Sequence, residues 1–230
     1  MKQLLNRWAL VTGSARGIGQ QIAIGLAQEG CNVIVHGRLK EHTKTTLGLL
    51  QEYGIKTDSV EGELSSVSDV ERMIDIIRKA HGGIDILYNN AAIQNKWKDI
   101  WDITLDEWKE LFQINLYSMI LLCNAFAPGM KARGFGRIVN LSSGIKDIPQ
   151  LAPYSVSKAA VDKYTMDLAA ELKGSGVLVN YLDPGWLKTD LGGPNAEHEV
   201  TTVLPGALKP VLLDNGGPTG TFFRAQDYRE

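Results

Sequence analysis

A tyrosine and a lysine stand four residues apart in the stretch APYSVSKAAVDKY, residues 152–164. The pattern predicts a helix, on which Tyr154 and Lys158 share one face, one turn apart. A free phenol titrates near ~10, and a pKa of about 7 requires roughly 4 kcal/mol of differential stabilisation of the phenolate. A nearby ammonium supplies part of that in a partly desolvated site. The pair is either a proton-transfer site or an ordinary surface pair, and the rest of the sequence decides between them.

A glycine-rich turn lies near the start of the chain, where TGSARGIG occupies residues 12–19. Gly13, Gly17 and Gly19 let the backbone turn tightly and approach a pyrophosphate at the positive end of the following helix. Glycines also mark strand-to-helix turns that bind nothing. The position after a first strand, with a βαβ unit behind it, favours the nucleotide site.

The end of the second expected strand, VIVHGR, indicates which nucleotide fits. Dehydrogenases selective for NAD often carry an acid here that binds the ribose hydroxyls. Gly37 stands at that position, Arg38 follows it, and Arg16 lies in the glycine loop. Two guanidinium groups without a carboxylate favour the 2′-phosphate of NADP(H), although NAD(H) stays open. The alternative is that both arginines are solvated surface residues.

Strand-length apolar runs alternate with segments of helical period along the whole chain. Strands are expected at 8–13, 31–37, 55–63, 84–91, 136–143, 176–185 and 219–224, and helices at 17–30, 40–54, 68–83, 104–134 and 153–173. This order predicts an α/β fold: a Rossmann-type doubly wound three-layer sandwich with a seven-stranded parallel sheet, formed by one domain over residues 1–230. The irregular stretch at about 186–206 follows a strand's carboxyl end and is the expected substrate loop.

Composition narrows the classes of protein. A net charge of −2 over 230 residues gives no sign of a nucleic-acid or anionic-membrane partner. Apolar runs such as SMILLCNAFA are too short to span a bilayer, and the N-terminus is expected to be neither a signal nor a transit peptide. Cys31 and Cys123 are expected to be buried free thiols, and no cysteine–histidine cluster has metal-ligand spacing. A reducing cytoplasm fits these features.

Further motifs follow in a fixed order: NNAA at 89–92, Asn115 within QIN, NLSS at 140–143, then Tyr154 and Lys158. With the glycine loop, this set resembles the short-chain dehydrogenase/reductase superfamily over essentially the whole chain. The string DPGWLKTDLGGPNA at 183–196, with GPTGTFF near the C-terminus, is similar to the carbonyl-reductase-like branch. That branch reduces ketones and aldehydes with NADPH.

The resemblance implies roles for four catalytic residues. Tyr154 is the acid/base, and Lys158 binds the nicotinamide ribose and lowers the pKa of the tyrosine. Ser143 orients the substrate oxygen, and Asn115 holds a water that relays protons from Lys158. Only eleven positions separate Ser143 from Tyr154, which is shorter than the usual spacing, so Ser142 stays open as the alternative serine. Lys163 and Tyr164 do not match the motif and are expected to be bystanders.

The resemblance also implies a set of residues that contact the nucleotide. These are Gly13, Ser14, Arg16, Gly17, Ile18, Gly19, Arg38, Glu63, Leu64, Asn90, Ala91, Tyr154, Lys158, Pro184, Gly185 and Thr189. Two positions depart from the family pattern. Ala92 replaces a frequent glycine, and Glu63 stands where an aspartate usually faces the adenine.

Bulky apolar residues are candidates for the substrate pocket or for subunit contacts. They are Trp97, Trp101, Trp186, Ile145, Ile148 and Leu151. The helix around 107–130 is apolar on more than one face, and in this family it pairs with its copy, so a homodimer or homotetramer is expected.

The sequence thus predicts a cytoplasmic, NADP(H)-preferring oxidoreductase that interconverts a ketone or aldehyde and an alcohol by hydride transfer. Its partner is a small-molecule carbonyl or alcohol substrate, with no nucleic acid, membrane or metal. Two alternatives stay open: an NAD-linked dehydrogenase of a polyol or sugar acid, and a nucleotide-binding regulator without turnover.

Overall fold

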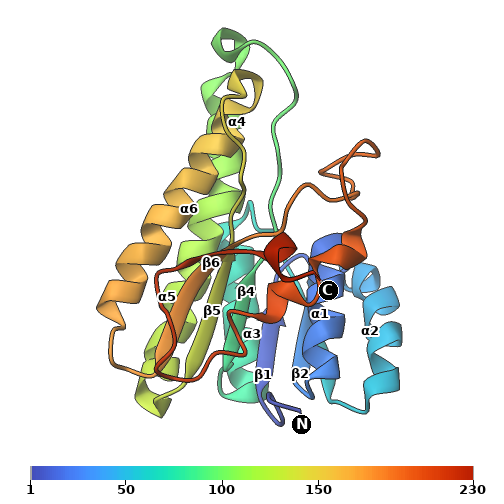
Figure 1. The fold of residues 1–230 in the computed structure, drawn as a ribbon, viewed down its shortest axis with the longest axis vertical. Helices are drawn as coiled ribbons and strands as arrows, with labels where there is room; N and C mark the ends of the chain where they lie inside the picture. Colours follow the sequence, from blue (N-terminus) through green and yellow to red (C-terminus); the bar gives the residue numbers. More distant parts are fainter. Residues whose placement is uncertain (1, 230) are drawn as a thin grey trace.

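The computed structural model describes residues 2–229, and its centre is a parallel sheet of seven strands. The strands run in the order β3-β2-β1-β4-β5-β6-β7, so the chain winds outward from β1 first in one direction and then in the other (Figure 1). Their bounds are Trp8–Val11 (β1), Asn32–Gly37 (β2), Thr57–Glu61 (β3), Ile86–Asn89 (β4), Gly136–Leu141 (β5), Val177–Asp183 (β6) and Phe222–Arg224 (β7). The predicted doubly wound fold with seven parallel strands is confirmed.

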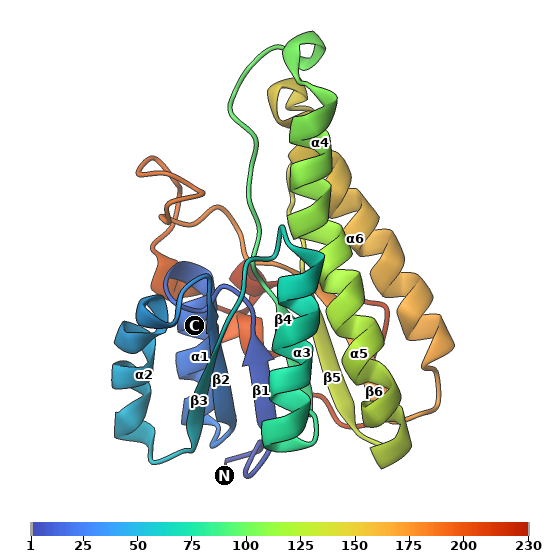
Figure 2. The same cartoon turned by 180° about the vertical axis from the view of Figure 1, so that it is seen from behind.

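Two hydrophobic cores cover the two faces of this sheet. On one face, α1 (Gly17–Gln28), α2 (Lys44–Leu50) and the segment 203–213 pack against β1 and β2. On the other face lie α3 (Val67–His81), α5 (Ser118–Arg133) and α6 (Ala152–Glu171), which Figure 2 shows in front of the sheet. Every residue of β2 and of β5 is buried, because parallel strands covered on both faces have no solvent side.

The helix expected at 104–134 is continuous but contains a π-helical turn. A capping box between Thr104 and Glu107 starts α4 (Leu105–Phe112), the π turn occupies Gln113–Tyr117, and α5 follows directly. Among residues 2–229, one helix, Leu105–Arg133, is long and apolar enough to cross a membrane by length and composition alone. The core helix of a soluble protein can have the same length and composition, and much of α5 belongs to the second core.

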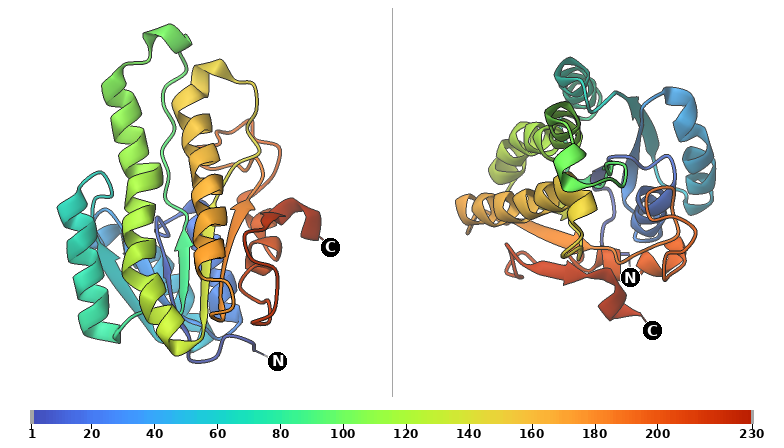
Figure 3. Two further views of the ribbon diagram at one scale, coloured as in Figure 1. Left: turned by 90° about the vertical axis from the view of Figure 1, so that its left-hand side faces the viewer. Right: turned by 90° about the horizontal axis from the view of Figure 1, so that it is seen from above.

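Other elements differ from the prediction mainly in length. The helix expected at 40–54 divides into a 3-10 turn at Lys40–Thr43, the short α2, and a second turn at Gln51–Tyr53. Between β6 and β7 the chain forms short 3-10 turns at Val200–Val203 and Gly206–Leu208. The segments after β4 and β6 rise above the carboxyl ends of the strands, the edge seen from above in the right panel of Figure 3.

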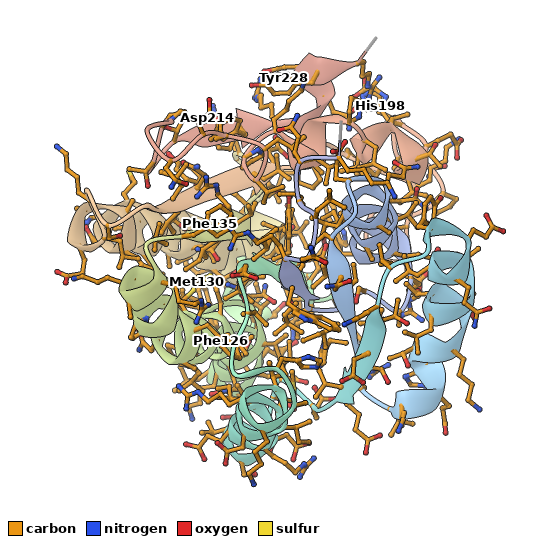
Figure 4. All side chains as sticks on the ribbon, turned by 90° about the horizontal axis from the view of Figure 1, so that it is seen from below. Phe126, Met130, Phe135, His198, Asp214 and Tyr228 are labelled. Carbon is orange, nitrogen blue, oxygen red and sulfur yellow. The ribbon has the colours of Figure 1, made fainter. Side chains whose placement is uncertain are left out.

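The fully buried Arg137 lies near the start of β5, next to Phe135, which Figure 4 labels in the view from below. Arg137 donates from Nη2 to the carbonyl oxygen of Leu213 at 2.7 Å and to Oδ1 of Asn215 at 2.9 Å. Its guanidinium and that of Arg7 lie 4.5 and 3.7 Å from the ring centre of Phe135. Burial lowers the pKa of Arg137 to about 10. These contacts tie Leu213 and Asn215 to β5, away from the edge of the sheet where the carboxyl ends of the strands lie. The thiols of Cys31 and Cys123 are buried and free, as predicted.

Candidate active site

The glycine loop between β1 and α1 is shaped by close approaches that only glycine permits. Gly13 and Gly17 have φ angles of +63° and +61°. A Cβ at Gly13 would lie 3.0 Å from Cβ of Ala91, and one at Gly19 would lie 2.5 Å from the carbonyl oxygen of Gly13. The first approach brings the segment that follows β4 against the loop, and the second folds the loop onto the start of α1.

The buried His36, which the sequence motifs do not predict as a site residue, fixes the conformation of the glycine loop. The amide of Gly13 donates to Nδ1 of His36 at 2.9 Å, so Nε2 carries the proton and donates to the carbonyl oxygen of Gly62 at 3.1 Å. Burial lowers the pKa of His36, which keeps the ring neutral in this arrangement. The signal in the sequence is a polar residue within the fully apolar strand VIVHG.

Thr12, also missed, joins the loop to the strand end NNAA. Its Oγ1 accepts from the amides of Asn90 and Ala91 at 2.9 and 3.0 Å. The Asn90 side chain returns a bond from Nδ2 to the carbonyl oxygen of Thr12 at 2.8 Å. Asn90 and Ala91 therefore lie at the glycine loop, where the resemblance places them, and they also fix its shape.

The start of α1 fits a pyrophosphate group. Arg16 occupies the N-cap position, and its side chain makes no capping hydrogen bond. Within residues 2–229, the backbone amides of Gly17 and Ile18 donate to no protein acceptor. Free amides at the positive end of a helix dipole bind anions. The chemistry of these donors therefore matches a nicotinamide dinucleotide bound through its phosphates.

The segment after β6 lies over the same loop. A Cβ at Gly17 would stand 3.6 Å from Cγ2 of Thr189, and Arg16 pairs with Asp190 at 2.9 Å. Both partners of this ion pair are mostly exposed, so it contributes little to stability. Gly185 takes a φ of +87°, which the turn after Pro184 requires.

The ribose end of the predicted nucleotide site is open. Gly37 is buried at the end of β2, and Arg38 beyond it is exposed. Glu63 follows β3 and is half-buried, while its neighbour Leu64 is buried. Glu61, paired in register with Gly37, accepts a hydrogen bond on Oε2 from the amide of Lys40 at 2.9 Å. A carboxylate therefore lies beside this end of β2, and the preference for NADP(H) over NAD(H) stays a prediction.

Tyr154 and Lys158 lie in the first turns of α6 and are both buried, at 8% and 5% exposure. Nζ of Lys158 donates to the carbonyl oxygen of Leu141 at 2.7 Å and lies 5.7 Å from the centre of the Tyr154 ring. The alternative pair behaves as predicted for bystanders. Lys163 pairs with Asp167 on the surface, and Tyr164 donates to Oδ1 of Asn124 at 3.2 Å.

The pKa of the Tyr154 phenol is raised in the folded chain. Burial raises it, the hydroxyl of Ser143 lowers it by hydrogen bonding, and the carboxylate of Asp183 raises it again. Desolvation therefore outweighs the favourable contacts of the folded chain. The expected lowering depends also on the positive charge of a bound nicotinamide ring, so it stays a prediction. Burial also lowers the pKa of Lys158 to about 8, against the opposing effect of Asp162.

The two serines at the end of β5 point to different partners. Ser142 is buried and donates from Oγ to Oδ1 of Asp162 at 2.5 Å. Ser143 accepts from the amide of Ile145 at 3.2 Å, and its hydroxyl lowers the pKa of the Tyr154 phenol. Ser142 is therefore engaged with Asp162, whereas Ser143 acts on the phenol. That Ser143 orients a substrate oxygen stays a prediction.

Asn115 sits in the π-helical turn and joins three elements. Its Oδ1 accepts from the amide of Ile93 at 2.9 Å, and its Nδ2 donates to the Ile93 carbonyl oxygen at 2.9 Å and to Oγ of Ser157 at 3.1 Å. Ser157 in turn donates to the carbonyl oxygen of Tyr154 at 2.8 Å. π turns inside helices frequently mark functional sites. Asn115 positions the backbone around Tyr154, and its proton-relay role stays a prediction.

The predicted pocket residues divide into two groups. The aliphatic ones pack in one cluster with Tyr154 and Leu111, and they are Ile145, Ile148 and Leu151. The three tryptophans lie outside this cluster, with exposures of 63% for Trp97, 91% for Trp101 and 56% for Trp186. The structure therefore brings only the aliphatic residues to the phenol.

The fold, the open amides at α1 and the buried tyrosine–lysine pair define a class of protein, the dinucleotide-dependent oxidoreductases. Comparison with known proteins identifies the family: the short chain dehydrogenase model matches residues 7–200, so the chain belongs to the short-chain dehydrogenase/reductase family. It is an oxidoreductase of that family, whose members act on small molecules.

Among the relatives is dehydrogenase/reductase SDR family member 4 of Sus scrofa, 37% identical over 191 residues, which cover 82% of this chain and 68% of the relative. An uncharacterized oxidoreductase, YvrD of Bacillus subtilis, is 34% identical over 226 residues, 96% of this chain and 80% of the relative. A solved gluconate 5-dehydrogenase from Burkholderia cenocepacia, in complex with NADP and tartrate, superimposes with a TM-score of 0.84 at 29% identity, covering 96% of this chain and 94% of that one.

Proposed function

We propose that the protein is an NADP(H)-preferring oxidoreductase that interconverts a ketone or aldehyde and an alcohol by hydride transfer. One observation carries the proposal. Tyr154, Lys158 and Ser143 lie at the carboxyl edge of the sheet, where Lys158 donates to the carbonyl oxygen of Leu141, the last residue of β5, and Ser143 lowers the pKa of the Tyr154 phenol. This edge also carries the glycine loop, so the acid and the nucleotide would meet at one place.

When bound, the nicotinamide group donates or accepts the hydride. The residues of the chain prepare the substrate for that step. Ser143 donates a hydrogen bond to the substrate oxygen, and Tyr154 gives its phenolic proton to the same oxygen during reduction. In the oxidation of an alcohol the phenolate takes the proton. Lys158 stabilises the phenolate by its charge, and the aliphatic cluster around the ring excludes water from the proton-transfer step.

The preference for NADP(H) rests on the ribose end of the site. Gly37 brings no acidic side chain of its own to the end of β2, and the exposed Arg38 follows it. Arg16 lies in the glycine loop, where it pairs with Asp190. The NADP-bound gluconate 5-dehydrogenase supports this choice. The test is fluorescence titration of wild type and Arg38→Ala with NADPH and NADH. A selective loss of NADPH affinity of about tenfold or more is expected, from the ~1.5–3 kcal/mol of a hydrogen bond to a charged group. Equal affinities in both proteins would contradict the cofactor argument.

The catalytic proposal is tested with a panel of ketones and aldehydes, followed by NADPH absorbance. Wild type is expected to turn over at least one of them, and Tyr154→Phe to lose that activity. Tyr164→Phe is the matched control, because Tyr164 lies on the same helix and bonds to Asn124 away from the site. Tyr154→Phe activity close to wild type would refute the assignment.

A second candidate is a dehydrogenase of a sugar acid. It is supported by the similarity to gluconate 5-dehydrogenase. The same assay, run in the oxidative direction with gluconate and a polyol, separates the candidates. The third alternative, a nucleotide-binding regulator, would bind NADPH and turn over nothing on either panel.

We also propose that residues 1–230 act as one domain, in the cytoplasm, as a homodimer or homotetramer. The exposed apolar residues on the long helix and on α6 support the oligomer, among them Tyr117, Val156 and Met166. Light scattering during gel filtration measures the number of subunits, and a monomer at all concentrations would contradict this part.

A further inference from the structure

Asn140 and Leu141 at the end of β5, and Ser142 directly after it, each make a polar contact with α6. Nδ2 of Asn140 donates to Oγ1 of Thr165 at 2.8 Å. The carbonyl oxygen of Leu141 accepts from Nζ of Lys158 at 2.7 Å. Oγ of Ser142 donates to Oδ1 of Asp162 at 2.5 Å. Two of these contacts hold a charged group, one an ammonium and the other a carboxylate.

The carboxylate stands one helical turn after the ammonium. Lys158 and Asp162 are four residues apart on α6, so they lie on the same face. Lys158 is buried, and the hydrogen bond from its Nζ goes to a neutral carbonyl oxygen. Among residues 2–229, no carboxylate lies within ion-pair distance of that ammonium. Asp162 acts on it through space, from a place fixed by Ser142.

We propose that Asp162 is a positioning residue for the reaction: anchored by Ser142, its carboxylate keeps the buried Lys158 protonated and seated on the carbonyl of Leu141. The inference rests on the proposed function only where turnover is concerned. The relation between Asp162 and Lys158 is a property of the folded chain. It also gives the two serines of NLSS separate tasks, since Ser142 holds the carboxylate and Ser143 meets the phenol.

Other charged groups around the pair come from each element that packs there. On α6 itself, Tyr154 is the titratable group that faces Lys158 and Asp162. Lys163 on the same helix pairs with Asp167 on the surface instead. From β6, Asp183 acts on both Tyr154 and Asp162, and Tyr181 senses Asp162. From β7, Arg224 lies 4.0 Å from Asp183 and offsets part of its charge.

The direction of the effect follows from these contacts. Burial lowers the pKa of Lys158 to about 8, and the charge of Asp162 raises it. Removing that charge therefore moves the pKa of Lys158 further down, toward neutral pH, where the ammonium would be lost. Burial raises the pKa of Asp162, and Asp183 adds to that rise, while the bond from Ser142 and the charge of Lys158 oppose it.

The test is a pH titration of Lys158 itself by NMR on the whole chain labelled with [ε-13C]lysine. Lys158→Arg assigns the resonance by removing it. A midpoint near 8 is expected in the wild type. In Asp162→Asn it is expected to fall by about one pH unit, on the order of the coupling between charges one turn apart. Asp167→Asn, an exposed acid on the same helix, is the matched control and is expected to leave the midpoint unchanged.

The inference is overturned if the Lys158 midpoint in Asp162→Asn equals that of wild type. It is also overturned if Asp167→Asn lowers this midpoint by as much as Asp162→Asn does. If Asp162→Asn does not fold, Ser142→Ala takes its place, with a smaller fall of the midpoint expected and an unchanged midpoint contradicting the inference. In the carbonyl assay, the alkaline limit of reduction should move down with the midpoint. A chain that reduces no carbonyl refutes the proposed function, and the NMR titration still decides on Asp162.

Discussion

Replacing Asn115 by alanine tests whether this side chain holds the architecture around Tyr154. The substitution removes both partners of the Ile93 backbone, at 2.9 Å each, and the contact to Ser157 at 3.1 Å. Asn115 is 4% exposed, whereas Ile93 is half-buried, so the two unpaired groups of Ile93 recover part of their hydration. A buried unsatisfied polar group costs about 1–3 kcal/mol, and the two groups of Ile93 together are expected to cost about 2 kcal/mol, at the lower end of that range for each. For a chain of this size, that lowers Tm by about 4 °C or more.

Urea denaturation and calorimetry measure this loss. Asn124→Ala is the control, because Asn124 makes one exposed contact with Tyr164, and its effect should stay within about 0.5 kcal/mol. Turnover with NADPH completes the assay, since displacement of Ser157 and of the Tyr154 backbone lowers kcat. A stability loss for Asn115→Ala below about 1 kcal/mol would refute the reasoning. Normal stability with reduced kcat would instead favour the relay of protons alone.

Two further predictions address the loop and the phenol. Gly19→Ala would place a Cβ 2.5 Å from the Gly13 carbonyl oxygen, so NADPH affinity measured by fluorescence should fall at least about tenfold, from a loss of at least ~1.4 kcal/mol; Gly48→Ala, where a Cβ meets nothing within 4 Å, should leave it unchanged. Asp183→Asn removes a charge that raises the pKa of Tyr154, so that pKa should fall and alcohol oxidation should begin at lower pH; a pH profile that moves upward would contradict this.

The sequence predicts the sheet and the glycine loop well because both depend on local pattern. Apolar runs and helical periods fix the order of elements, and Gly13, Gly17 and Gly19 mark a turn that other residues do not fit. The helix at 40–54 begins as a 3-10 turn, in which the hydroxyl of Thr43 donates to the carbonyl oxygen of Lys40 at 2.7 Å, a local contact of the kind that competes with regular helix. The π turn at Asn115 leaves no such signal, since it inserts a residue without breaking the apolar pattern.

The electrostatics of the site depend on the folded structure. A tyrosine and a lysine one turn apart suggest a lowered phenol pKa, yet burial raises this pKa in the folded chain. Asp162 looks like part of a solvated face in VDKY, and its contact with Ser142 appears only when α6 lies on β5. Likewise His36 reads as a polar residue in a strand until Gly13 and Gly62 are placed on its two nitrogens.

The most direct test of the central claim is the single-turnover rate of hydride transfer from NADPH to a carbonyl substrate in Tyr154→Phe, compared with Tyr164→Phe. General acid catalysis contributes about 10²–10⁴-fold. The account predicts a loss in that range for Tyr154→Phe, with unchanged NADPH affinity, and a rate close to wild type for Tyr164→Phe. A Tyr154→Phe rate within a few-fold of wild type would contradict the account.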